Sequence, residues 1–174
     1  MTRTIVIDAR TRIIAIYLFL IIGLASTVIG FFDNFLKTEM WIFGTLYLSL
    51  SDLNADFEGF AATRIFAWAT FVLVIVSSVL FALARLLKSK AFGKVVVLFC
   101  CLTAASAILV FIFALVMANK HDVSIAEGPI LMLTGGLLAS GAAAGGSLLQ
   151  KDKKDVTIEE IHEEEYDKSG KSRV

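Results

Sequence analysis

Four long apolar stretches divide the chain, and charged residues bound each of them. They cover residues 13–32, 65–87, 95–117 and 129–149. A helix of about 20 residues, rising about 1.5 Å per residue, crosses a hydrocarbon core of roughly 30 Å. The pattern therefore predicts four transmembrane helices. Arg85 is the only charged residue inside these limits, and it can extend from the end of the second stretch to the lipid headgroups.

The composition agrees with a membrane protein of one domain. Of the 174 residues, 57% are hydrophobic, and the mean hydropathy is +0.81. A soluble domain of this size cannot bury so much apolar surface, so we expect the lipid bilayer to surround it. The formal net charge is zero, and we expect no nucleic-acid partner.

The basic residues are distributed unevenly between the polar segments. Thirteen of the 16 Lys and Arg residues lie in or beside residues 1–12, 88–94 and 150–174. The segments 33–64 and 118–128 hold the other three. Because Lys and Arg accumulate on the cytoplasmic side of membrane proteins, both termini are predicted to be cytosolic. The segments 33–64 and 118–128 then form two extracellular loops.

The loop lengths predict the fold class. Short connections make neighbouring helices antiparallel, so we expect an all-α membrane protein with a left-handed transmembrane four-helix bundle. The first extracellular loop is longer than a connection requires, and such loops usually carry their own structure or a function.

Residues 40–51 of this loop, MWIFGTLYLSLS, are rich in aromatic and aliphatic side chains. Leu46 and Leu48 fall on one side of an alternating pattern, and Thr45, Tyr47 and Ser49 fall on the other. This period of two is typical of a strand. We therefore predict an extracellular strand or hairpin that forms a small β-sheet on the bundle. The alternative is an interfacial segment in which Trp41 and Tyr47 belong to an aromatic belt.

The predicted outer face is acidic, with seven acidic residues against three basic ones. Asp52, Asp56 and Glu58 imitate the first half of a calcium-binding EF-hand loop, but Phe57 stands where that loop needs glycine. A solvated turn is the plainer interpretation. If this face lines a conduit or receives a partner, its charge should favour cations.

Small residues repeat at intervals of four in the fourth apolar stretch. Three such stripes are Gly136, Ser140 and Ala144; Gly141 and Gly145; and Gly135, Ala139 and Ala143. Small residues let membrane helices approach closely. We interpret the stripes as packing within the bundle, with contact to another copy or another membrane protein as the alternative.

The sequence offers no catalytic chemistry. No Asp, Glu, Lys or His lies at membrane depth, and the CxxC, HExxH and GxSxG motifs are absent. We therefore predict no enzyme activity and no cofactor or metal. Cys100 and Cys101 diverge by about 100° on a helix, so we interpret them as apolar filler, with palmitoylation as the alternative.

The last polar segment combines three signals. Lysines within 151–154 lie next to the membrane and can bind anionic lipid headgroups. Residues 157–160 form a capping-box pattern that would begin a short acidic helix, with disorder as the alternative. The chain ends in Ser172, Arg173 and Val174, the hydroxyl-x-aliphatic-carboxylate ending that PDZ domains capture.

The first loop resembles the signature of the claudin superfamily, which also includes the peripheral myelin protein group and the stargazin-like channel gamma subunits. The resemblance rests on Trp41, on Gly44, Leu46 and Tyr47 of Gly-Thr-Leu-Tyr, and on Arg64 before the second helix. Two features depart from the family pattern: the paired loop cysteines are missing, and Tyr47 replaces the second tryptophan. The resemblance implies an extracellular sheet that is held without a disulfide.

Three functions agree with this layout. The first is a claudin-like protein of cell–cell contacts that seals or lines a paracellular route at the plasma membrane. The second is an auxiliary subunit that sets the trafficking or gating of a channel or receptor. The third is a four-span vesicle or sorting protein of the MARVEL type, for which the strand-like first loop is unexpected.

Overall fold

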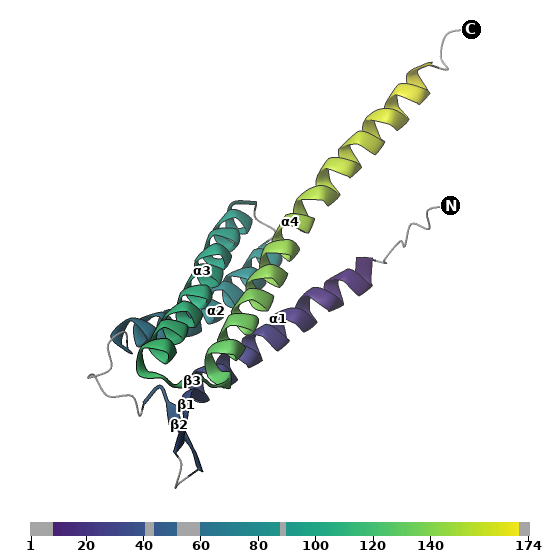
Figure 1. Cartoon of the computed structure of the whole chain (residues 1–174). Helices are drawn as coiled ribbons and strands as arrows, with labels where there is room; N and C mark the ends of the chain where they lie inside the picture. The colour runs from purple at the N-terminus through teal and green to yellow at the C-terminus, as the bar shows by residue number, and fades with distance from the viewer. Residues whose placement is uncertain (1–8, 41–43, 52–59, 88–89, 171–174) are drawn as a thin grey trace.

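The computed structural model of the chain describes residues 9–40, 44–51, 60–87 and 90–170. These residues form the helices α1 (Ala9–Phe32), α2 (Phe60–Leu87), α3 (Lys90–His121) and α4 (Glu127–Gly170). They also form the strands β1 (Asn34–Met40), β2 (Gly44–Ser49) and β3 (Ser124–Ile125), in one sheet of order β2-β1-β3. Figure 1 shows the sheet at one end of the helix bundle, here called the sheet end. The start of α1 and the end of α4 lie toward the opposite end, here called the terminal end.

All four helices are long and apolar enough to cross a membrane, as an integral membrane protein requires. The spans are Thr11–Phe32, Phe60–Leu87, Phe92–His121 and Glu127–Leu148. The prediction of four apolar spans is therefore confirmed.

The helices extend beyond the predicted apolar limits. α2 begins at Phe60 rather than at residue 65, so Arg64 lies inside the helix and not in the loop before it. Ala61 and Ala62 are strong helix formers, and hydropathy alone does not report this preference. Likewise, α3 begins at Lys90 and ends at His121, four or five residues outside the predicted limits of 95–117.

α4 differs most from its prediction, because it continues without a break from Glu127 to Gly170. No separate helix begins at residues 157–160, and the alternative of disorder does not hold for the described part of the tail. From Ser147 to Ser169 the sequence has no glycine or proline, and Lys and Glu are good helix formers. Nothing therefore interrupts the helix where the apolar stretch ends.

Buried residues on α2 and α3 follow a seven-residue repeat. On α2 they are Phe60, Thr63, Ala67, Thr70, Val74, Ser77, Phe81 and Ala84, at alternating intervals of three and four. On α3 the same spacing runs through Val96, Cys100, Thr103, Ala107, Val110, Ala114 and Met117. This repeat is the one that left-handed helix packing requires. Many of these positions hold small side chains, which lets the helices lie close together.

α1 and α4 approach each other through glycines that are seven residues apart in each helix. A Cβ atom at Gly23 would lie 2.5 Å from the backbone nitrogen of Ala139, and one at Gly135 would lie 2.6 Å from the backbone nitrogen of Thr27. One turn from the sheet, a Cβ atom at Gly30 would lie 2.6 Å from the carbonyl oxygen of Gly128. Backbone therefore packs directly on backbone along this pair.

Several buried hydroxyl groups in the bundle donate hydrogen bonds to backbone carbonyls of their own helices. Thr27 Oγ1 donates to Gly23 O at 2.9 Å, and Thr103 Oγ1 donates to Phe99 O at 2.8 Å. Thr70 of α2 also contacts Ser106 of α3, with 2.8 Å between the two hydroxyl oxygens. These bonds satisfy polar groups that would otherwise be costly to bury.

The C-terminus of α3 directs the chain into β3. Asp122 has a φ of 52°, and the Val123 N–H donates to Ala118 O at 3.0 Å. A left-handed residue followed by this bond is the Schellman motif that ends many helices. The turn places Ser124 and Ile125 beside β1.

We predict that Asp122→Gly stabilises the protein by about 0.5–1 kcal/mol, because glycine adopts a positive φ without the Cβ penalty. Thermal unfolding in detergent micelles measures the change. Asp122→Ala is the control, since it removes the carboxylate and retains Cβ. An equal gain for alanine and glycine would show that charge, not backbone conformation, determines the effect.

Candidate functional site

A hairpin of β1 and β2 is the main feature of the sheet end. The Asp33 N–H still donates to Ile29 O at 2.9 Å, as in a helix, while Asp33 Oδ1 accepts a bond from the Asn34 N–H at 2.7 Å. Aspartate at this position offers the backbone an alternative to the helical bond. α1 therefore ends at Phe32, and the chain continues directly as β1.

A β-bulge fixes the base of the hairpin against the bundle. The strand register shifts between Asn34 and Leu36, and the adjacent side chains of Phe35 and Leu36 are both fully buried. In a regular strand two neighbours point to opposite faces, and a bulge changes this alternation locally. Both residues belong to the apolar cluster at the sheet end, which also contains Phe31, Leu50, Phe60, Ala67, Val110, Met117, Ala118 and Met132.

β3 holds the other edge of β1. Leu36 pairs with Ile125, and the Ala126 N–H donates to Phe35 O at 3.1 Å. The short loop between α3 and α4 thus joins the sheet that the long loop begins. The base of the hairpin is fixed on two sides, by the bundle and by β3.

The outer half of the hairpin, here called the tip, is exposed along residues 44–47 of β2. Leu46 is 44% exposed and Tyr47 is 50% exposed, and as neighbours in a strand they point to opposite faces. In Figure 1 the hairpin projects from the bundle, away from the terminal end. Gly44 begins β2 with a φ of 77°, a conformation that residues with a Cβ rarely adopt. The tip therefore offers side chains on both faces and an edge of β2 that no other described strand covers.

Three of the five predicted first-loop residues lie in one strand. Gly44, Leu46 and Tyr47 share β2, as the prediction of a strand or hairpin within residues 40–51 expected. Trp41 lies outside the described residues, so the aromatic-belt alternative for it stays open. Arg64 is exposed in the second turn of α2.

Two further predictions fall outside the described residues. One prediction concerns the acidic residues Asp52, Asp56 and Glu58, which imitate part of a calcium-binding loop. The other concerns the PDZ-type ending at residues 172–174. Among the side chains described, no group of three His, Cys, Asp or Glu residues could hold a metal ion.

The acidity of the sheet end depends on residues that the structure leaves undescribed. Its described acids are Glu39 of β1, the partly buried Asp33, and the exposed Asp122 and Glu127. The described bases there are Lys37, Arg64 and Lys120. These acids outnumber the bases by one, so most of any preference for cations would come from the loop acids outside the described residues.

The small residues of α4 serve different purposes. Gly136 and Ser140 are buried, and a Cβ atom at Gly136 would lie 2.8 Å from the Ala107 side chain of α3. Ala144 is partly buried in the cluster near the terminal end. A Cβ atom at Gly141 or at Gly145 would meet no described atom within 4 Å, so the structure shows no close contact within the bundle at these two. Their stripe lies on a different side of α4 from the glycines that contact α1 and α3.

Comparisons with known proteins add no relative. No family model, curated protein or solved structure matches the chain. The site is therefore assessed from its geometry.

Sequence reasoning missed β1 and β3, and with them Phe35 and Leu36. The bulge explains the first omission, because two consecutive buried residues break the period of two that marks a strand. A strand of two residues such as β3 has no detectable period at all. The signal that could have indicated β1 is Asp33-Asn34, a polar pair at the end of an apolar helix that favours a turn.

Proposed function

We propose that the chain is a plasma-membrane protein of cell–cell contacts that acts in a claudin-like manner through its hairpin. The observation that supports this proposal is the division of the hairpin into a fixed base and an exposed tip. Phe35 and Leu36 are fully buried at the base, whereas Leu46 and Tyr47 are exposed at the tip. A recognition element benefits from such a base, because a prearranged surface loses less entropy on binding.

The chemistry of the tip suits a protein partner. Tyrosine is enriched at protein interfaces, where its ring packs and its hydroxyl forms hydrogen bonds. The outer edge of β2 can also accept a strand from a partner by β-addition. The expected partner is therefore the ectodomain of a protein on the facing cell, including another copy of this chain.

The proposal needs the sheet end outside the cell and both termini in the cytosol. The basic residues of the polar segments support this orientation. Epitope tags at the two termini should bind antibody only after the cells are permeabilised. A barrier role with a preference for cations is the finer form of the proposal, and the loop acids outside the described residues would provide it.

A second candidate is the auxiliary subunit of a channel or receptor. Gly141 and Gly145 favour it, since they are four residues apart on α4 and meet open space in the monomer. A small-xxx-small pair facing lipid is the pattern by which membrane helices associate. In that case the membrane-embedded face, rather than the hairpin tip, would determine the function. A vesicle role of the MARVEL type would instead be indicated by retention on internal membranes.

A mixed-cell assay separates these candidates. We expect the labelled protein to concentrate at borders between two expressing cells and not at borders with a non-expressing cell. The double variant Leu46→Ser/Tyr47→Ser should lose most of this enrichment while reaching the surface in normal amounts. Gly141→Leu/Gly145→Leu is the matched variant and should keep it. Loss with the glycine variant alone would support the auxiliary subunit, and enrichment that does not depend on the neighbouring cell would refute a contact function.

A further inference from the structure

Arg85 lies near the end of α2, where the sequence predicts that it extends to the headgroups, and it also contacts the bundle. Its guanidinium carbon lies 5.5 Å from the centre of the Phe81 ring, and its Nη2 donates to Gly146 O of α4 at 3.4 Å. The Nε atom is buried without a hydrogen-bond partner. A bond of 3.4 Å is long for this type of contact, so the guanidinium is only partly satisfied by the protein.

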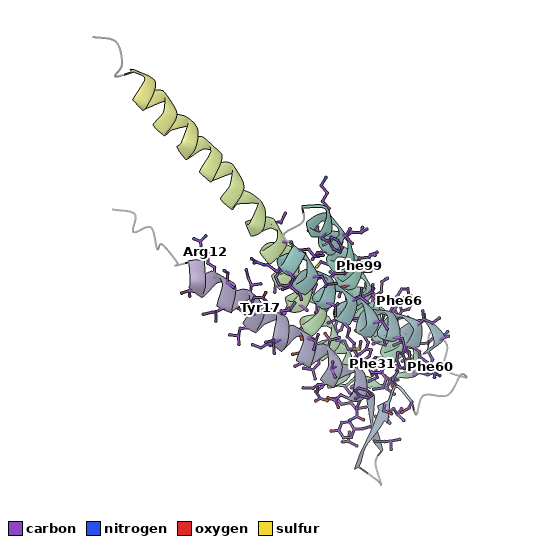
Figure 2. All side chains as sticks on the ribbon, turned by 180° about the vertical axis from the view of Figure 1, so that it is seen from behind. Arg12, Tyr17, Phe31, Phe60, Phe66 and Phe99 are labelled. Atoms are coloured by element: carbon purple, nitrogen blue, oxygen red, sulfur yellow. The ribbon has the colours of Figure 1, made fainter. Side chains whose placement is uncertain are left out.

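Three helices form the surroundings of Arg85. Tyr17 of α1 contacts the same Phe81 ring, with 5.8 Å between the ring centres. α4 lies very close to this ring at Gly146, where a Cβ atom would lie 2.7 Å from Phe81 and 3.1 Å from Ile16. The cation is therefore held at a junction of α1, α2 and α4. Figure 2 shows Tyr17 and Arg12 on the part of α1 that extends toward the terminal end.

Arg85 has no acidic counterpart among the described side chains. The side chains of α4 are described as far as Leu148; up to there, the acids with described side chains are Asp33, Asp122 and Glu127, and all three lie at the sheet end. The other described charges at the terminal end are Arg12 and Lys94, which are both basic and exposed. A cation that is partly withdrawn from water needs a counter-charge, because its desolvation is costly.

The length of α2 places Arg85 at the level of a headgroup. Residues 60 and 85 are 25 positions apart, or about 37 Å along a helix that rises about 1.5 Å per residue. The hydrocarbon core is roughly 30 Å thick, so Arg85 reaches the polar layer of one leaflet when Phe60 lies at the other interface. Lipid phosphates occupy this layer.

We propose that Arg85 binds the phosphate of an anionic phospholipid at the junction of α1, α2 and α4. Phe81 and Gly146 hold the guanidinium in place, and the outer N–H groups on Nη1 and Nη2 that Gly146 does not use bind the phosphate oxygens in the forked geometry that suits arginine. The lysines of residues 88–94, which follow α2, and those of residues 151–154, which lie in α4 just beyond its apolar part, increase the attraction for a negative headgroup. This site is independent of the contact function of the hairpin.

Lipid titration of the full-length protein in a neutral detergent tests the site. Native mass spectrometry and thermal unfolding would follow the addition of phosphatidylglycerol, phosphatidylcholine or inorganic phosphate. We expect phosphatidylglycerol to bind and to raise the unfolding temperature, with little effect of the other two. Arg85→Gln should weaken this binding on the order of tenfold, as expected for a charged hydrogen bond.

Arg12→Gln is the matched control, since it removes an exposed charge from the same end of the bundle and should leave the strongest binding event unchanged. Should Arg85→Gln fail to fold, Arg85→Lys decides the question, because it keeps the charge, loses the fork and should weaken binding several-fold. Equal binding by wild type and the Arg85 variants, or equal loss with Arg12→Gln, would overturn the proposal. Equal stabilisation by inorganic phosphate would refute the lipid as ligand and indicate a site for free anions.

Discussion

A single methyl group at position 135 is expected to disrupt the packing of α1 on α4. In Gly135→Ala the new Cβ would lie 2.6 Å from three atoms, namely Gly23 O, Thr27 N and Thr27 Oγ1. Two of these atoms belong to the backbone of α1, so no change of rotamer can relieve the contact. The helices must separate or bend, and we expect a loss of roughly 2–3 kcal/mol, at the upper end of the range for overpacked cores.

Gly141→Ala provides the matched control in the same helix. It makes the same chemical change six residues further along, where a Cβ atom meets nothing within 4 Å. Alanine restricts the backbone more than glycine, so a neutral effect or a small gain is expected. Thermal unfolding in detergent, followed by size-exclusion chromatography, measures both variants. A similar loss at positions 135 and 141 would mean that glycine is needed for backbone conformation and not for the approach of α1.

This pair of variants also shows what the sequence could predict about α4. The repeat of small residues indicated that some face of the helix permits close approach, but three stripes satisfied the pattern equally. The face in use depends on the partner, and α1 carries the matching signal in Gly23 and Gly30, seven residues apart like Gly128 and Gly135. Both helices have to be compared before the correct stripe can be chosen.

The number of helices was predictable because the membrane imposes it. A stretch of apolar residues that is long enough to span the bilayer has few alternatives to a helix, since every backbone polar group must be satisfied internally. The helix ends were less predictable, because the helices extend into polar sequence where backbone propensity decides. Hydropathy therefore did not predict two features: Arg64 lies inside α2, and α4 extends to Gly170.

The sheet was predictable only in part, for a related reason. β2 shows the period of two in its sequence, where Leu46 and Leu48 alternate with Tyr47 and polar residues, and Leu48 packs against the bundle. β1 hides this period through its bulge, and β3 exists only because the turn at Asp122 places two residues beside β1. Pairing of the two loops is a tertiary contact, and no local pattern in either loop indicates it. The base of the hairpin therefore depends on the bundle, and this dependence can be measured.

We expect Phe35→Ala to detach the hairpin from the sheet end. The Phe35 side chain is fully buried among Phe31, Phe60 and other apolar residues, and its carbonyl oxygen accepts the bond from Ala126. Replacing a buried phenylalanine by alanine typically costs about 3–5 kcal/mol, through lost burial and the cavity that remains. The loss should act on the sheet first, because the helices keep their own packing. Limited proteolysis should therefore cut residues 33–59 faster, at temperatures where the helices are still folded.

Leu46→Ala is the control for this prediction. It shortens an apolar side chain of the same hairpin, but Leu46 is 44% exposed at the tip, so we expect a change within about 0.5 kcal/mol and an unchanged rate of cleavage. The comparison separates two roles of the hairpin. Position 35 should determine whether the hairpin stays packed on the bundle, and position 46 should determine which partner it can contact. If both variants were cleaved at the wild-type rate, the bundle would not be what holds the hairpin. If Leu46→Ala were cleaved as fast as Phe35→Ala, the tip would itself be part of the folded core, and an exposed recognition surface there would have to be abandoned.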